Sequence, residues 1–273
     1  MNRSLLAALA VLVALVPVQG AEKSSEESKK KAGPVNWLWQ HLPVPKFGGK
    51  SKDAAGWHDL ALKLSIQPPA PKLPETKRLG LSSIYALTKY DQERTCLIAG
   101  GAYGIPTVAL RLFNTYGTRQ ALSNPYTGAL AIFASRLLND RAPRIFEDGL
   151  QLRDFVSVRD VARAFRLALE RDGADGSVVN VGTGLGTSIL DVATKLAAVL
   201  RKDIEPELTG EFRVGDIRHC YADITLARER IGFEPEVELD AGMRDLAEWL
   251  EGRVARDRVD AAADELTRRG LAG

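Results

Sequence analysis

A tyrosine and a lysine four residues apart, Tyr85 and Lys89, are the first residues of this sequence whose types and spacing could do chemistry. On a helix, such residues lie on one face with their Cβ atoms about 5–6 Å apart. An ammonium group beside a phenol favours the phenolate, and it therefore lowers the pKa of the tyrosine. The phenol could then act as a base near neutral pH. By spacing alone most such pairs are ordinary surface pairs, so the interpretation depends on the surrounding sequence.

The elements that would position this pair follow an α/β pattern. The 273 residues are 45% apolar and 26% charged, which is the composition of an ordinary globular domain. From about Ser82 onward, helical and strand patterns alternate with short loops. Residues 85–103 predict a helix, and 107–113 (TVALRLF) predict a strand that is apolar on both faces, which is typical of a parallel sheet. Further predicted elements are a strand at 177–181 and helices at 127–139, 159–170 (capped by Ser157), 188–200 (capped by Thr187 or Ser188), 225–230 and from 241 onward.

Charge and cysteine content exclude several functions. Lys plus Arg number 37 and Asp plus Glu 35, so the net charge of +2 gives no broad field that would attract nucleic acid. The two cysteines, Cys96 and Cys220, have no metal-type spacing and are interpreted as ordinary thiols. We therefore expect no nucleic-acid partner, no metal site and no disulfide scaffold.

The N-terminus follows the pattern of a signal peptide. Arg3 precedes an apolar run at 5–18, and Gly20-Ala21 is a candidate cleavage point. The run is shorter than the roughly 20 residues that span a bilayer, so no stable membrane span is expected. The alternatives are a buried core helix and a wrongly assigned start codon. The predicted organisation is a signal peptide at 1–20, an irregular extension at 21–73, the main domain at 74–250 and a charged helical tail at 251–273.

Five motifs succeed one another along the main domain. They are SIYALTK at 83–89, LRLFNTYG at 110–117, RDFVSV at 153–158, NVGTG at 180–184 and GDIRH at 215–219. In this order they resemble the extended short-chain dehydrogenase/reductase family, specifically its NAD-dependent nucleotide-sugar epimerases and dehydratases. Residues 123–128 (SNPYTG) and 215–223 look most like the dTDP-L-rhamnose or UDP-sugar 4-epimerase branch. The resemblance implies a Rossmann-like parallel sheet flanked by helices, with a small C-terminal substrate-binding subdomain.

The resemblance also implies roles for individual residues. Tyr85 would take the proton of the sugar 4-hydroxyl while NAD accepts the hydride, and Lys89 would hold the nicotinamide ribose. On the substrate side, the diphosphate would be contacted by Asn114, Arg153 and Arg213. Phe146 would pack on the pyrimidine, Asp216 would contact the nucleotide ribose, and Arg218 would contact a phosphate. Guanidinium groups suit phosphate oxygens. The alternative for Phe146 is a core position, and for Arg153 and Arg213 it is a surface charge or an ion-pair partner.

The dinucleotide-binding half that such enzymes place before the tyrosine is missing from the sequence pattern. Residues 22–84 contain no Gly-x-Gly-x-x-Gly turn and are broken by linkers, whereas two βαβ units of about 30 residues each would need nearly all of them. The family's serine or threonine partner has no secure match, and Ser65 is the nearest candidate. The glycines at 182–186 (GTGLG) follow a predicted strand, but Thr187 stands where Gly or Ala is expected, so this loop is assigned to the substrate side.

These observations predict an incomplete Rossmann-like, NAD-dependent nucleotide-sugar 4-epimerase acting on a dTDP- or UDP-hexose at C4. The alternative is a non-catalytic sugar-nucleotide-binding or interaction protein, or the remnant of a truncated or fused gene. A homodimer is expected, because family members commonly pair through helices that include the one bearing the tyrosine. The signal peptide suggests export, whereas the chemistry of the family suggests the cytoplasm.

Overall fold

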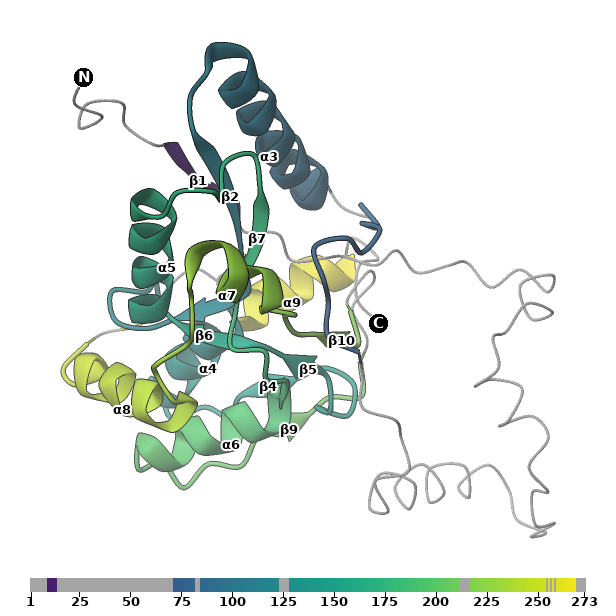
Figure 1. Cartoon of the computed structure of the whole chain (residues 1–273). Helices are drawn as coiled ribbons and strands as arrows, with labels where there is room; N and C mark the ends of the chain where they lie inside the picture. The colour runs from purple at the N-terminus through teal and green to yellow at the C-terminus, as the bar shows by residue number, and fades with distance from the viewer. Residues whose placement is uncertain are drawn as a thin grey trace, which may run out of the picture. The chain divides into compact units, whose positions relative to one another are not determined.

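A computed structural model describes residues 9–13, 71–81, 84–122, 128–211, 217–253, 255, 257 and 259–268 (Figure 1). The elements described below belong to one compact unit. Ser65 and residues 123–127 lie outside the described residues.

The main sheet has three parallel strands in the order β1-β2-β7 (Figure 1). They are β1 (Leu9–Val13), β2 (Thr107–Leu112) and β7 (Val178–Val181). Strand β2 is buried along its whole length, which confirms the expected two-sided strand. Strand β1 comes from the apolar run that resembles a signal peptide, and it pairs with β2 from Leu9 opposite Thr107 to Val13 opposite Arg111.

The long helix α3 (Ile84–Tyr103) and helix α5 (Val158–Glu170) both pack against β1 and β2. Helix α3 ends because Gly104 adopts the left-handed conformation, with φ at 65°, and Pro106 cannot continue the helix. Close packing of α3 on β2 depends on Gly100, since a Cβ there would lie 2.8 Å from the Cβ of Thr107. In α5, Ser157 accepts a hydrogen bond from the backbone of Arg159 at 3.2 Å, which confirms the predicted cap.

The second half of the domain contains short strands and the remaining helices. Three small sheets pair β3 (Asn114–Tyr116) with β6 (Phe155–Ser157), β4 (Arg144–Ile145) with β9 (Glu207–Leu208), and β5 (Leu152–Arg153) with β10 (His219–Cys220) and β8 (Thr187–Ser188). The helices are α4 (Ala129–Leu138), α6 (Ile189–Val199), α7 (Thr225–Ile231), α8 (Leu239–Leu250) and α9 (Val259–Arg268). Of the two candidates for the cap of α6, it is Ser188 that accepts from the backbone of Asp191, at 3.0 Å.

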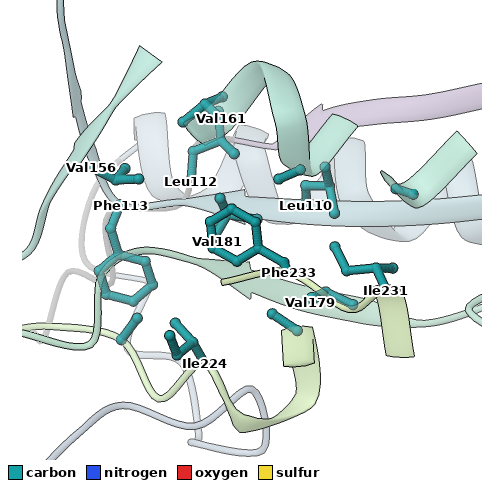
Figure 2. Close-up of a cluster of buried hydrophobic side chains, with 14 of the residues drawn as sticks. Leu110, Leu112, Phe113, Val156, Val161, Val179, Val181, Ile224, Ile231 and Phe233 are labelled. Atoms are coloured by element: carbon teal, nitrogen blue, oxygen red, sulfur yellow. The ribbon is translucent and has the colours of Figure 1, made fainter. Parts of the chain in front are cut away.

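Two apolar clusters form the core. The first joins the main sheet to α5 and α7, and Figure 2 shows Leu110 and Val181 of the sheet packed with Phe233, which follows α7. The second joins α4, α6 and α8 through residues such as Phe133, Leu196 and Met243, all nearly inaccessible to water. Within the described part of the chain, no helix is long and apolar enough to cross a membrane.

Candidate functional site

Tyr85 and Lys89 lie at the start of α3, one turn apart, as the sequence predicts. The Tyr85 side chain is 49% exposed. Lys89 Nζ lies 5.8 Å from the centroid of the Tyr85 ring, and it donates to Gln92 Oε1 at 3.4 Å. The ammonium therefore faces the aromatic ring. Burial raises the pKa of Tyr85, which is the direction opposite to the lowering expected from Lys89.

A buried ion pair that the sequence analysis missed fastens α3 to the sheet. Glu93, two turns after Tyr85, is 1% exposed and accepts two hydrogen bonds from Arg111 of β2, at 2.8 and 2.9 Å. Arg111 also donates to the backbone oxygen of Glu75 at 3.1 Å. The Glu75 carboxylate in turn accepts from the backbone of Asn180 in β7 at 2.7 Å, and burial raises its pKa. These contacts fix the helix that carries Tyr85 relative to β2 and β7.

A second buried acid, Asp154, connects the ends of several strands. Its carboxylate accepts from the backbone and the hydroxyl of Thr183, both at 2.7 Å, and from the backbones of Gly184 at 2.9 Å and Ala222 at 3.1 Å. Burial raises the pKa of Asp154, although all four donors favour the charged form. Its backbone oxygen accepts from the backbone of Asn114 at 2.9 Å. Asp154 therefore places Asn114 beside the glycine loop at 182–184.

The contacts of Asp154 also explain the glycine loop that resembles a pyrophosphate-binding turn. The backbone N–H groups of Thr183 and Gly184, which a pyrophosphate would need, already bind this internal carboxylate. Gly182 must lack a side chain, because a Cβ there would lie 2.5 Å from Asp154 Oδ2. This geometry agrees with the assignment of the loop to the substrate side of the domain.

Arg153 and Phe146 lie close to the β5–β10 pair. Arg153 is a buried residue of β5, and it donates to the backbone oxygens of Leu152 at 2.9 Å and Arg218 at 3.2 Å. Phe146 follows β4 and is half-buried, outside both apolar clusters, and its backbone oxygen accepts from the Gln151 side chain at 2.8 Å. Phe146 therefore does not occupy the core position that was the alternative to packing on the pyrimidine.

Arg218 is engaged by two carboxylates from the loop after β4. Its guanidinium contacts Glu147 at 2.8 Å and forms a two-pronged pair with Asp148 at 2.6 Å. These hydrogen bonds lower the pKa of Asp148 and raise that of Arg218. Glu147 adopts the left-handed backbone conformation, with φ at 54°, which is uncommon for a residue with a side chain. In this structure the Arg218 guanidinium is held in ion pairs with Glu147 and Asp148, whereas the resemblance implies a contact to a phosphate.

The structure thus brings part of the predicted substrate side together. Pairing of β5 with β10 and the contacts of the loop after β4 gather Phe146, Arg153 and Arg218, and Asp154 connects Asn114 to them. Arg213 and Asp216 lie outside the described residues. Among the side chains that the structure describes, no group of three or more has the composition of a metal site. Glu93, Asp154 and Glu147 were missed; Asp154 lies inside the motif at 153–158, whereas Glu93 and Glu147 lie in none of the five motifs.

The fold and this group of residues define a Rossmann-like domain with a Tyr-x-x-x-Lys pair on a helix that packs against the main sheet. Residues 65–182 match the sequence model of the NAD dependent epimerase/dehydratase family. The resemblance inferred from the motifs is thus confirmed for this part of the chain.

Individual relatives agree with this family. The chain is 37% identical over 169 residues to dTDP-L-rhamnose 4-epimerase of Burkholderia thailandensis, covering 62% of this chain and 46% of that protein. It is 35% identical over 188 residues to UDP-glucose 4-epimerase of Mycolicibacterium smegmatis, covering 68% and 58%. A structure of UDP-glucose 4-epimerase from Thermotoga maritima with UDP-glucose aligns with a TM-score of 0.61 and 36% identity, over 68% of this chain and 59% of that one. The chain spans about half the length of the curated relatives it matches.

Proposed function

We propose that this chain carries the substrate-binding half of an NAD-dependent nucleotide-sugar 4-epimerase and binds a dTDP- or UDP-hexose. The observation that carries the proposal is that the β5–β10 pair and Asp154, through contacts with the backbone, bring Arg153, Asn114 and the loop that carries Phe146 into one part of the domain. Arg153 would clamp the diphosphate, for which a planar guanidinium is suited. The half-buried ring of Phe146 would pack on the base, and Asn114 would contact the diphosphate.

In an epimerisation, Tyr85 would exchange the proton of the sugar 4-hydroxyl, and NAD would supply the hydride chemistry. Tyr85 and Lys89 fit the nicotinamide ribose by type and position on α3. The glycine loop at 182–186 does not fit the pyrophosphate of NAD, since its amides at Thr183 and Gly184 bind Asp154. No hydride-transfer step is therefore assigned to this chain alone, and the pyrophosphate would need residues outside the described ones.

A second candidate, a nucleotide-sugar-binding protein without catalysis, is favoured by one observation. The backbone N–H groups of Thr183 and Gly184 already bind Asp154, so the glycine loop offers no place for the pyrophosphate of NAD. The two candidates differ in NAD binding and in turnover.

Calorimetry on the purified full chain tests the proposal with UDP, dTDP and NAD as separate ligands. We expect one UDP or dTDP per chain, and about tenfold weaker binding for Arg153→Lys, because a lysine cannot form the two-pronged contact. Arg166→Lys is the matched control, since Arg166 lies on α5 and is exposed. Absence of UDP and dTDP binding would overturn the proposal.

Activity is assayed by conversion of UDP- or dTDP-hexoses at C4 in the presence of NAD. One NAD per chain and an epimer supports the enzyme, and Tyr85→Phe should then abolish the conversion, because Tyr85 is the phenol of the motif that can take the proton. Nucleotide binding with neither NAD binding nor epimer supports the non-catalytic candidate.

The proposed homodimer pairs two copies of α3 in antiparallel orientation. Ile84 and Ile98 are 82% and 63% exposed, and with Leu87 they form a stripe that is interrupted by Asp91 and Arg94. A two-fold axis between residues 92 and 93 would set Leu87 against Ile98 and Asp91 against Arg94 of a second copy.

Light scattering after size exclusion measures this pairing. We expect a dimer in the wild type, a monomer for Asp91→Arg, and a dimer again when Asp91→Arg is combined with Arg94→Asp, because the charges would simply exchange sides. A wild type that is monomeric at all concentrations would refute it.

The apolar N-terminal run could be either a cleaved signal peptide or a strand of the main sheet. Cleavage after Gly20 would remove β1, which pairs with β2 along five residues. Export through this signal and retention of the strand therefore exclude each other in one mature protein. N-terminal sequencing distinguishes a start at Ala21 from an intact Met1.

A further inference from the structure

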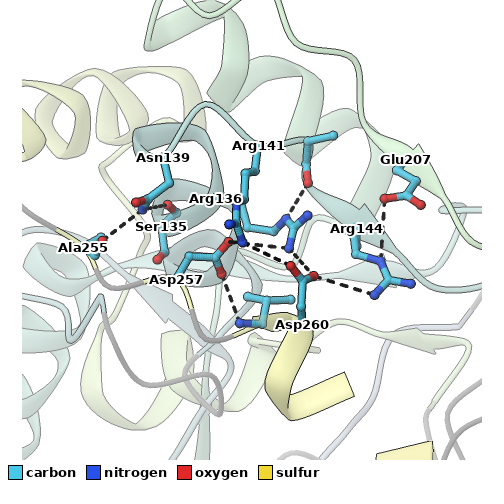
Figure 3. A network of polar contacts seen from close by, with 11 residues as sticks. Ser135, Arg136, Asn139, Arg141, Arg144, Glu207, Ala255, Asp257 and Asp260 are labelled. Carbon is cyan, nitrogen blue, oxygen red and sulfur yellow. Dashed lines mark hydrogen bonds and ion pairs between the residues drawn. The ribbon is translucent and has the colours of Figure 1, made fainter. Parts of the chain in front are cut away.

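The segment after α8 is held against the α4–β4 connection by a group of charged side chains (Figure 3). Arg136 Nη1 lies 2.6 Å from Asp260 Oδ1 and 3.6 Å from Asp257 Oδ2. Arg141 reaches the same two carboxylates at 3.1 and 3.2 Å. Two acids of the tail thus share two arginines of the main domain.

The centre of this group is buried. The side chains of Arg136 and Asp257 are 7% and 4% exposed. Arg136 Nε donates to the backbone oxygen of Ala142 at 2.6 Å, and Asp257 accepts from the backbone of Val259 at 3.0 Å. Outside this centre, the Asn139 side chain donates to the backbone oxygen of Ala255 at 2.9 Å. A buried, hydrogen-bonded pair of this kind is costly to break, so the tail is attached at defined points rather than solvated along its length.

Arg144 extends the group to the β4–β9 pair. It begins β4, and its guanidinium lies 3.8 Å from Asp260 and 3.6 Å from Glu207 of β9 (Figure 3). The Glu211 carboxylate lies 3.8 Å from the same guanidinium. Arg144 is also the residue opposite Glu207 in the strand register. The Asp260 carboxylate of the tail therefore contacts Arg144, the residue at which β4 and β9 pair.

The β4–β9 pair leads directly into the candidate base-binding loop. Phe146 follows β4, and the backbone of Glu147 donates to the backbone oxygen of Glu211 at 2.8 Å. Glu147 and Asp148 then hold Arg218. A shift of β4 against β9 would move this whole loop.

We propose that Asp257 and Asp260 are positioning residues, which set the β4–β9 pair and through it the loop that carries Phe146. The proposed positioning of β4 and β9 rests only on the contacts of Asp257 and Asp260 and is independent of the proposed function. The consequence for nucleotide binding rests on the proposed function.

Hydrogen exchange of the full-length protein tests the first part. Three backbone amides cross between the two strands: Glu207 to Pro143 at 2.8 Å, Thr209 to Ile145 at 2.9 Å, and Glu147 to Glu211 at 2.8 Å. In Asp260→Asn we expect these amides to exchange about tenfold faster, because a charge-assisted contact is weakened locally. The amides of Ala109 and Phe113, which bond within the main sheet, serve as the internal reference.

The controls separate positioning from general stabilisation. Asp264→Asn changes an exposed acid on the same helix and should leave all five amides unchanged. Asp260→Glu keeps the charge and should restore slow exchange. Asp257→Asn is the second variant, with the larger effect expected from its burial. Equal exchange in the wild type and both asparagine variants would overturn the proposal, and so would equal acceleration of the reference amides.

The second part is measured as the Kd for UDP in the same variants. We expect binding about three- to tenfold weaker in Asp260→Asn and unchanged in Asp264→Asn, in proportion to the loss of order in the loop. If the wild type does not bind UDP, the proposed function fails, and the exchange result alone decides the positioning role. If UDP binds equally to all variants while exchange changes, the tail orders β4 and β9 without serving the nucleotide, which overturns the second part.

Discussion

Replacing Asp154 with asparagine should destabilise the domain strongly, because asparagine matches its shape but not its hydrogen bonds. One carboxylate oxygen accepts from Thr183 twice, and the other accepts from the backbones of Gly184 and Ala222. An asparagine side chain has one oxygen and one NH₂ group. If its NH₂ group faces Gly184 and Ala222, it meets two backbone N–H donors; if it faces Thr183, the hydroxyl can turn and accept from it, but the backbone N–H of Thr183 is left without an acceptor in a site that water does not reach.

The magnitude follows from one hydrogen bond that is lost and three that lose the charge of their acceptor. A hydrogen bond to a charged group contributes about 1.5–3 kcal/mol, and weakening three others by about 0.5–1 kcal/mol each adds a similar amount, which gives about 3–6 kcal/mol. The burial that raises the pKa of Asp154 also makes its charge costly, which places the net loss near the lower end, about 3–4 kcal/mol. For a domain of this size the expected fall in Tm is about 6–16 °C.

Thermal unfolding followed by circular dichroism or calorimetry measures this loss. Thr183→Val removes the hydroxyl donor and leaves the three backbone donors, so it should cost about 1.5–3 kcal/mol, less than Asp154→Asn. Asp175→Asn, at an exposed turn, is the control and should stay within about 0.5 kcal/mol of the wild type. A Tm of Asp154→Asn within about 2 °C of the wild type would refute the reasoning, as would a larger loss in Thr183→Val.

Three further predictions concern other parts of the domain. Glu93→Gln leaves Arg111 buried beside a neutral partner, so it should lower the free energy of unfolding in urea by about 3–5 kcal/mol. Changing both Glu93 and Arg111 to methionine should recover most of this loss, and equal stability of the single and double variants would contradict the prediction. In Gly242→Ala the new Cβ would clash with the hydroxyl of Tyr116 and lie 2.9 Å from its Cζ. We therefore expect the free energy of unfolding to fall by about 1–3 kcal/mol, and Tyr116→Phe should partly relieve this loss. A Gly242→Ala variant as stable as the wild type would contradict the prediction. Burial lowers the pKa of His219 from its ordinary 6.5, so the folded state binds fewer protons than the unfolded state, and stability is lost as the pH falls through 6.5 towards the folded pKa. The drop in Tm between about pH 7.5 and about pH 5.5 should be smaller in His219→Gln, and an identical drop in both proteins would argue against this assignment.

Local sequence patterns were sufficient for the elements and for the family. The apolar segment 107–113, the helix at 85–103 and the cap at Ser157 depend on residues that are near one another in the chain, and the structure contains them with small shifts of the ends. The order of the motifs likewise depends only on the sequence, and residues 65–182 match the family that they indicate.

Only the tertiary structure decided the partners of the charged side chains. Glu93 and Arg111 are 18 residues apart, and Arg218 meets Asp148 across 70 residues. Periodicity cannot predict such pairs, because which charges meet depends on which strands lie side by side. The direction in which the pKa of Tyr85 shifts also depends on tertiary packing. The spacing in the sequence places Lys89 near the ring, but burial of the phenol raises its pKa. The sequence by itself therefore determined which residues could form a nucleotide-sugar site, whereas the packing of distant segments decided which of them stand together and which are already held by a neighbour.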